Sequence, residues 1–436
     1  MQETTLITGQ LLAPTGDPFA MPPAEAWTWE RRGAVAVSDG RILATGPADS
    51  LRAAYPQARV IDHGEGVILP GFVDAHAHYP QTAIVASWGK RLIDWLETYT
   101  FPEEARFGDP DYARAQAETW LDLLIAHGTT SAASFCTIHP ASVDALFEAA
   151  EARGMGVTAG RTCMDRNAPD ALRDTAQAAH DETAAGIARW HGRGRARYAI
   201  TPRFTPTSSP EQLEALGALW AAHPGCAMQT HLSEQTDEVA WVGRLHPEAR
   251  DYLDTYERHG LVGPGALFGH AIWLTDRERA RLAESGSAVV HCPTSNAFIG
   301  SGLFDTARAR AEVIAVGLAT DTGGGSSFSM LRTMAAAYEI GQLSGIALHP
   351  AQLLWLATEG SARALRRADE IGTLAPGSMA DLAVLDLAST PAIAQRAARA
   401  GEIWEALFPT LMMGDDRGVA ATWVAGRPLK SASEQS

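Results

Sequence analysis

Short apolar runs alternate with segments of helical pattern along most of the chain, from about residue 66 onward. Eight runs have the composition of strands buried on both faces: VILPGFVDAHAH, TTSAASF, GVTAGRTCM, RYAITPRF, CAMQTHLSE, ALFGHAIWL, SAVVHCPTSN and VIAVGLATD. Helices are expected between them, for example over residues 111–127, 142–153, 210–222, 276–284 and 330–344, because several segments open with Pro, Ser or Asp. Eight βα units over about 300 residues predict an α/β fold, a (β/α)8 barrel of the TIM type with helices outside a closed parallel sheet.

The two chain ends do not follow this alternation. Residues 1–66 and 371–436 contain short β-like runs separated by turn signals, among them TLITGQLLAP, GAVAVSDGRILATGP and ATWVAGRPL. We therefore expect both ends to pair in one small domain, a β-sandwich, beside the barrel over residues 67–370.

Polar side chains follow the strands of the predicted barrel at the points where they end. Side chains alternate along a strand, so His76 and His78 at the end of the first strand point the same way. Later strands end in Arg203, His231, His270 and Asp321. The carboxyl ends of all strands meet at one mouth of such a barrel, where barrel enzymes carry their chemistry. Several imidazoles and a carboxylate in one mouth indicate a site for a metal such as zinc.

Each of these residues has an ordinary interpretation when it is taken alone. Asp321 could be the N-cap of a helix, and His231 or His270 could be a hydrogen-bonded histidine of the core. Four histidines and an aspartate at strand ends of one barrel favour the metal site instead.

Composition and charge narrow the class of protein. The 436 residues are 46% hydrophobic and 20% charged, which is ordinary for a globular protein. A formal charge of −16 would repel nucleic acid and an anionic membrane surface, so neither is expected as a partner. No signal peptide or membrane-spanning run is found, and the four cysteines are scattered without CxxC spacing, which is typical of a reducing compartment. A cytoplasmic protein is expected.

Several motifs resemble the guanine deaminase branch of the amidohydrolase superfamily. They are PGFVDAHAHYPQT, DWLETYTFPEEARF, CMDRNAPD, ITPRFTPTSSPEQ, THLSEQTDEV, HCPTSNAFIGSGLF and GLATDTGGGSSFSMLRTM, and the resemblance runs from about residue 60 to the C-terminus. The HxH and TD elements indicate only the superfamily, whereas PQT, YTFPEE and TPRF are specific to this branch.

The resemblance implies a metal site and its catalytic residues. One Zn²⁺ per chain would be held by His76, His78, His231 and Asp321, with Glu234 and His270 beside the reactive water. Asp321 would orient that water and take its proton, while Glu234 would protonate the ring nitrogen and then the leaving amine. His270 would either donate to the tetrahedral oxygen or hold the water.

The expected activity is the hydrolytic deamination of guanine to xanthine and ammonia, and the resemblance suggests a homodimer. The side-chain amide of Gln81 would both donate hydrogen bonds to a purine edge and accept them from it. The guanidinium group of Arg203 would donate hydrogen bonds to oxygen-6 and nitrogen-7 of the purine. Phe204 would pack near the ring. Two alternatives stay open, namely deamination of another heterocycle, such as a pterin, triazine or adenosine derivative, and a non-catalytic scaffold.

Two other metal designs are disfavoured. Cytidine-type deaminases combine an HxE element with PCxxC, and the HGE at residues 63–65 has no cysteine pair after it. Binuclear members of the superfamily often use a carboxylated lysine from the fourth strand, and RYAITPRF contains no lysine. A single metal ion is therefore expected.

Overall fold

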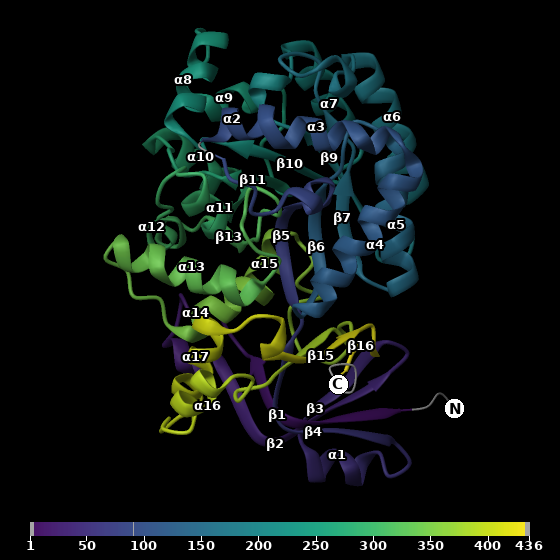
Figure 1. Ribbon diagram of the computed structural model, residues 1–436, viewed down its shortest axis with the longest axis vertical. Helices are drawn as coiled ribbons and strands as arrows, with labels where there is room; N and C mark the ends of the chain where they lie inside the picture. The colour runs from purple at the N-terminus through teal and green to yellow at the C-terminus, as the bar shows by residue number, and fades with distance from the viewer. Residues whose placement is uncertain (1–3, 90, 432–436) are drawn as a thin grey trace.

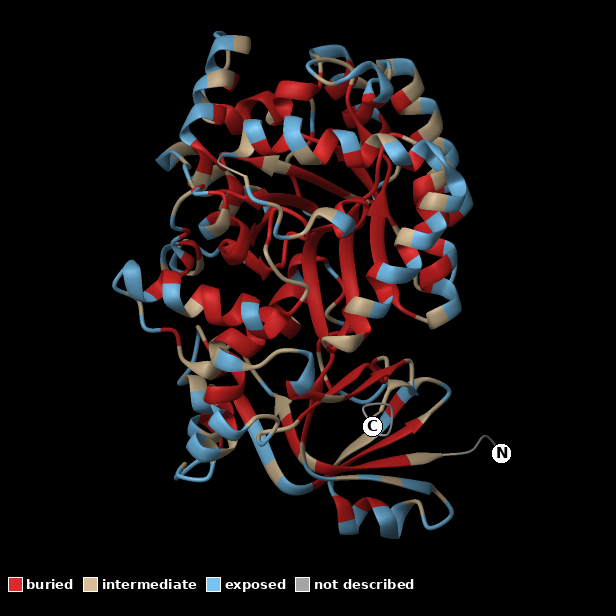
Figure 2. Ribbon diagram, in the orientation of Figure 1, coloured by how far each residue is buried: buried red, intermediate tan, exposed pale blue. Residues whose placement is uncertain are grey.

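A computed structural model describes residues 4–89 and 91–431, and it contains the expected barrel. Its eight strands run parallel in sequence order, and each lies in one of the eight apolar runs: β5 (Phe72–His78), β6 (Thr129–Phe135), β7 (Gly156–Gly160), β9 (Arg197–Pro202), β10 (Ala227–Leu232), β11 (Ala266–His270), β12 (Ala288–His291) and β13 (Ala315–Leu318). The two-residue strand β8 (Thr162–Cys163) pairs with β9. These strands are buried over most of their length (Figure 2).

The first and last strands meet at the mouth of the barrel. The N–H of Asp321, just after β13, donates to the carbonyl of His76 at 2.9 Å, and the N–H of His78 donates to the carbonyl of Thr322 at 2.6 Å. The backbone bonds that close the barrel therefore also fix three of the predicted metal ligands relative to one another.

Helices surround the strands, as the sequence predicted (Figure 1). They are α4 (Pro110–Ala126), α5 (Pro140–Arg153), α6 (Ala176–Trp190), α7 (Pro210–Ala222), α8 (Thr236–Leu245), α9 (Tyr252–Glu257), α10 (Asp276–Ser285), α11 (Pro293–Phe298), α12 (Thr306–Ala311), α13 (Met330–Leu343), α14 (Pro350–Trp355), η7 (Leu356–Gly360) and α15 (Ser361–Ala364). The side chains of Asp109, Thr175, Ser209 and Thr275 cap α4, α6, α7 and α10 by accepting from free backbone N–H groups. None of the helices in the described part of the chain is long and apolar enough to cross a membrane.

A second helical layer lies across the mouth, and the sequence analysis did not predict it. After the turn η2 (Tyr79–Ile84) come α2 (Leu92–Trp95), the π-helical turn η3 (Leu96–Thr100), α3 (Phe101–Glu104) and η4 (Ala105–Gly108). These short pieces follow one another almost without a break and cross the end of the barrel that faces away from the second sheet (Figure 1). Short turns η5 (Asp170–Leu172) and η6 (Thr205–Thr207) lie in other loops.

Both chain ends form a second sheet, as expected. Seven strands are hydrogen-bonded in one continuous order, β16 (Arg427–Lys430), β15 (Val419–Val424), β14 (Leu382–Leu385), β4 (Arg59–Pro70), β1 (Thr5–Pro14), β2 (Trp27–Ser38) and β3 (Arg41–Pro47). The accompanying helices are η1 (Pro23–Ala26), α1 (Ala48–Ala54), α16 (Pro391–Ala397), α17 (Ile403–Met413) and η8 (Asp416–Gly418). The core is continuous between the two parts, since Trp27 packs edge-on against Trp404 and shares one cluster with Phe72 of the barrel.

The first apolar run differs from its prediction, because it is two strands and not one. Strand β4 belongs to the second sheet until Pro70, and β5 of the barrel starts at Phe72. A Cβ atom on the intervening Gly71 would lie 2.3 Å from the Oγ1 atom of Thr130, so only glycine fits where the chain changes sheets. We propose Gly71, and not residue 66, as the first domain boundary.

Candidate active site

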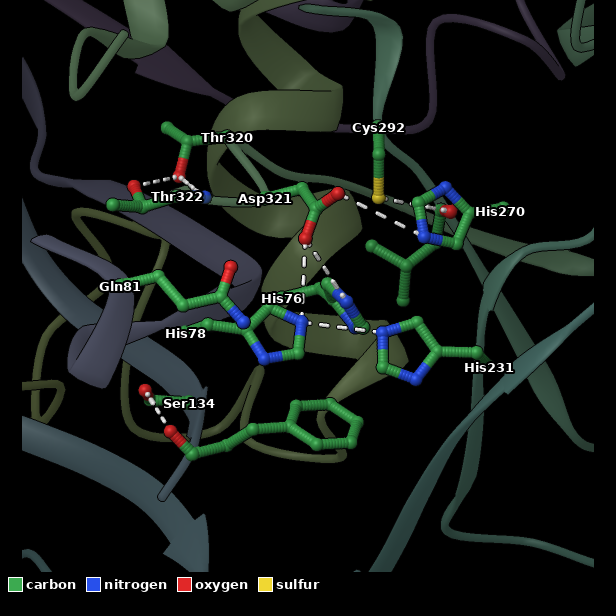
Figure 3. Close-up of polar contacts among 12 residues, drawn as sticks. His76, His78, Gln81, Ser134, His231, His270, Cys292, Thr320, Asp321 and Thr322 are labelled. Atoms are coloured by element: carbon green, nitrogen blue, oxygen red, sulfur yellow. Dashed lines mark hydrogen bonds and ion pairs between the residues drawn. The ribbon is translucent and has the colours of Figure 1, made fainter. Parts of the chain in front are cut away.

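The predicted metal ligands converge at the mouth of the barrel (Figure 3). His76 and His78 come from β5 and His231 from β10, and all three lie within reach of Asp321 or of one another. The Oδ1 atom of Asp321 is 3.4 Å from the Nε2 atoms of both His76 and His78, and the Nε2 atoms of His78 and His231 are 3.2 Å apart. The side chains that the sequence analysis assigned to the metal therefore lie close together in the structure.

These donor atoms suit a tetrahedral divalent metal. Zinc–nitrogen bonds of 2.0–2.1 Å place neighbouring ligand atoms about 3.3 Å apart, close to the separations seen here. The Nδ1 atom of His231 lies 2.7 Å from the carbonyl oxygen of Arg203, so a neutral ring carries its proton there and turns the lone pair of Nε2 inward. The Nε2 atom of His76 is buried and has no hydrogen-bond partner among the described residues. A cation at the centre would satisfy all of these groups.

The ionisation states also suit metal binding. Burial lowers the pKa of His78 to about 4 and lowers that of His231 well below its ordinary value. Burial alone would raise the pKa of Asp321, but the adjacent imidazoles of His76 and His78 hold it well below its usual range. The imidazoles of His78 and His231 are therefore neutral and the carboxylate of Asp321 is charged, as ligands must be.

Cys292 lies beside this site, although the sequence analysis gave it no role. A ligand atom of Cys292 lies within 4.8 Å of those of His76, His270 and Asp321. Burial raises the pKa of the Cys292 thiol well above its ordinary value, and its Sγ atom is 3.6 Å from the carbonyl oxygen of Val290, to which it can donate. We therefore treat Cys292 as a neutral neighbour of the metal site. The only feature of the sequence that could have indicated its place near the site is its position directly after the end of β12.

Glu234 and His270 lie together at one side of the donor atoms. The Nε2 atom of His270 is 3.5 Å from the Oε2 atom of Glu234 and 3.8 Å from the Oδ2 atom of Asp321. The hydroxyl of Ser301 donates to Glu234 at 2.7 Å. Burial, followed by the negative charge of Asp321, raises the pKa of Glu234 to about 8. Glu234 can therefore carry a proton at neutral pH.

The backbone around this site is conformationally costly. Ser233, His270, Ala271 and Asp321 all have φ angles between 48° and 66°, in the left-handed region that non-glycine residues rarely adopt. Such residues cost about 1–3 kcal/mol each and persist where the surrounding structure holds them. Their grouping at the ends of β10, β11 and β13 marks this mouth as the functional end of the barrel.

A pocket opens beside the metal donors. Of the site residues predicted from the sequence, all except His76 line it, namely His78, Gln81, Arg203, Phe204, His231, Glu234, His270 and Asp321. Leu92, Trp95 and Leu96 of the helical layer and Ile299 add an apolar wall that the sequence analysis missed. A lining that combines polar groups with apolar side chains, including the flat ring of Trp95, suits a planar polar ligand.

Glu104 accepts hydrogen bonds from two of the residues that are predicted to bind the substrate. Its Oε1 atom accepts from the Nε2 atom of Gln81 at 2.8 Å, and its Oε2 atom accepts from the Nη1 atom of Arg203 at 2.7 Å. All three side chains are buried. Glu104 is the last residue of the motif YTFPEE, and no role for it was predicted from the sequence.

Comparison with known proteins agrees with this geometry. Residues 67–429 match the model of the amidohydrolase family, and residues 33–58 match an imidazolonepropionase-like composite domain of bacteria. The guanine deaminase of Escherichia coli (strain K12) is 42% identical over 405 residues, which cover 93% of this chain and 92% of that protein.

Solved structures agree as well. A structure of E. coli guanine deaminase has a TM-score of 0.96 at 40% identity and covers 98% of this chain and 99% of that one. Guanine deaminase from C. acetobutylicum, with guanine bound in its active site, has a TM-score of 0.89 at 29% identity and covers 98% and 100% of the two chains. With the family model matching most of its length, this chain belongs to the amidohydrolase family.

Proposed function

We propose that this protein deaminates guanine hydrolytically to xanthine and ammonia with one zinc ion per chain. The observation that carries the proposal is a single pocket in which metal donors, a protonated carboxyl group and a polar recognition pair face one another. The resemblance to the E. coli enzyme and to the guanine-bound relative supports the choice of substrate.

His76, His78, His231 and Asp321 would hold the metal. When bound there, zinc acts as a Lewis acid that lowers the pKa of water to near neutrality. One ion is proposed because β9 supplies no lysine that could bridge a second one.

Two carboxyl groups that differ in charge at neutral pH would carry out the proton transfers. Asp321, which is anionic, accepts a proton from the water whose oxygen adds to carbon-2 of guanine. Glu234, whose raised pKa lets it carry a proton, donates that proton to the ring nitrogen beside carbon-2. The Glu234 carboxylate then takes the proton of the added hydroxyl group, as the carbon–oxygen double bond forms, and delivers it to the amine. The proton held by Asp321 returns to Glu234 and completes the cycle. The carbon–nitrogen bond breaks and ammonia leaves. His270 lies within 4 Å of both carboxyl groups and can hold the water or the new oxygen in place.

Gln81, Arg203 and Phe204 would bind the purine. Arg203 and Gln81 present hydrogen-bonding groups, and Phe204 packs against the ring beside the apolar wall. From the resemblance to guanine deaminases we also propose that the protein is cytoplasmic and forms a homodimer. Sedimentation of the purified protein would test the dimer.

The direct test is ammonia release by purified protein of known metal content across a substrate panel. We expect guanine to be deaminated with by far the highest kcat/KM among guanine, adenine, pterin and an aminotriazine. Faster release from another member of the panel would replace guanine as the substrate. No release from any of them, with metal fully bound, would favour a non-catalytic role.

A further inference from the structure

We propose that Glu104 is a positioning residue that makes the pocket selective for a ring lactam, an N–H group next to a carbonyl. Glu104 would fix Gln81 as a hydrogen-bond acceptor and Arg203 as the neighbouring donor. This arrangement would determine which edge of the substrate ring the two side chains can hydrogen-bond. This inference rests on the proposed function and deepens it.

The carboxylate of Glu104 is divided between two partners. One oxygen accepts from Gln81 and the other from Arg203, at 2.8 Å and 2.7 Å. Glu104 is only 1% exposed and is not among the described residues that line the pocket. It therefore acts on the substrate through Gln81 and Arg203, both of which do line it.

Glu104 determines which end of the Gln81 amide faces the substrate. A carboxylate can only accept hydrogen bonds, so Gln81 must turn its NH₂ group toward Glu104. The carbonyl Oε1 atom of Gln81 is then left for the pocket, and it has no hydrogen-bond donor among the described residues. A Cβ atom on Gly323 would lie 2.7 Å from the Cβ atom of Gln81, so this glycine leaves just enough room for Gln81 in this place.

Arg203 is held on two further sides. Its guanidinium carbon lies 5.7 Å from the centre of the Phe101 ring, on the same helix α3 as Glu104. Its carbonyl accepts from His231, which ties the arginine to the proposed metal ligands. The Nη1 atom of Arg203 donates one hydrogen bond to Glu104. The remaining N–H groups of its guanidinium group are therefore available as donors.

A donor next to an acceptor matches one edge of guanine. Oxygen-6 accepts and the neighbouring nitrogen-1 carries a hydrogen, so Arg203 would donate to the former and Gln81 would accept from the latter. A further N–H group of Arg203 stays available for nitrogen-7. Adenine places an amine and a bare nitrogen at the same two positions, and both would be mismatched. A site built to pair buried polar groups rejects such analogues strongly.

The test compares two ligands that differ only in the lactam, hypoxanthine and unsubstituted purine. Their dissociation constants are measured by calorimetry on zinc-loaded protein, and guanine kinetics are measured in parallel. We expect the parent to bind hypoxanthine at least about 30-fold more tightly than purine, since two buried hydrogen bonds are involved. Glu104→Gln should reduce that ratio to within about threefold, and guanine kcat/KM should fall about 100-fold at unchanged zinc content.

Glu103→Gln is the matched control. Glu103 lies beside Glu104 on α3 and is also buried, but it accepts from Tyr112 and Arg106 and not from the substrate residues. This variant should keep the preference for hypoxanthine. If Glu104→Gln also keeps it, Glu104 does not set the recognition edge and the inference is wrong.

Two further measurements separate the remaining outcomes. If Glu104→Gln fails to fold, Gln81→Met removes the acceptor, together with the amide hydrogen bond to Glu104, and leaves the Arg203–Glu104 pair in place. It should lower the hypoxanthine preference by about tenfold, and an unchanged preference would overturn the inference. If the parent binds hypoxanthine selectively but does not deaminate guanine, the proposed function fails while the lactam selectivity is still measured.

Discussion

Glu234 and Asp321 are both buried carboxyl groups of one pocket, but their surroundings shift their pKa values in opposite directions. Burial and the charge of Asp321 raise the pKa of Glu234, whereas the imidazoles of His76 and His78 outweigh burial at Asp321 and lower its pKa. A pair of groups separated in this way can supply an acid and a base at the same pH. The roles in the proposed reaction follow from this difference.

Changing Glu234 to glutamine tests this assignment. The substitution keeps the shape and removes the proton, so zinc should remain while the turnover of guanine falls by about 10²–10⁴-fold. The measurement is kcat together with metal content. A near-normal rate with full zinc would mean that another group moves the proton.

At the scale of single residues, the sequence was informative where strand geometry fixes direction. The alternation of His76 and His78 and the positions of His231 and Asp321 at strand ends predicted their convergence. Glu104 could not be found in this way. It is 23 residues from Gln81 and 99 from Arg203 along the chain. The periodicity of helices and strands does not predict a contact between residues so far apart.

Among the elements, the strands were predicted well because strands buried on both faces appear as apolar runs. The same property concealed the break at Gly71, where β4 and β5 join in one unbroken run. The helical layer over the mouth was missed because α2 and α3 are each four residues long and a π-helical turn separates them. Such short pieces have no measurable helical period.

The junction at Gly71 leads to a prediction about stability. Gly71→Ala should lower the free energy of unfolding by about 1–3 kcal/mol, because the new methyl group collides with Thr130. Gly243→Ala in α8 is the control, since nothing lies within 4 Å of its Cβ position. It should be neutral or stabilise by up to about 1 kcal/mol. Equal denaturation curves for Gly71→Ala and the parent would refute the steric explanation.

The end of β12 predicts a dependence of stability on pH. His291 is fully buried against Phe304, and neither ring nitrogen has a partner among the described residues. Burial, and then the charge of His270, lower its pKa to about 3. The unfolded chain, with an ordinary value of about 6.5, therefore binds the proton first. Stability is complete above that pH and is lost as the pH falls toward 3.

Replacing His291 by leucine should remove this contribution. Between pH 6 and pH 5 the zinc-loaded parent should lose about 1 kcal/mol more stability than His291→Leu, measured by chemical denaturation. His180→Gln, at a partly exposed position of α6, is the surface control and should keep most of the extra loss of stability that the parent shows. Identical slopes for the parent and His291→Leu would show that His291 does not titrate on unfolding.

In the whole molecule, the second sheet lies at the end of the barrel opposite the mouth (Figure 1), and no described residue of its strands lines the pocket. A continuous core nevertheless joins the two parts. The strong negative charge does not conflict with a neutral purine as substrate. The sequence predicted this general plan, whereas the exact point at which the chain passes between the sheets depended on a single close contact.

The central claim, one zinc ion serving guanine deamination, is tested most directly by an activity titration. Protein stripped of metal by a chelator is given increasing zinc while xanthine formation from guanine is followed. We predict no turnover without metal, a linear rise and a plateau at one zinc per chain, with no recovery in His231→Ala. Full activity in metal-free protein, or a plateau only at two ions per chain, would contradict the claim.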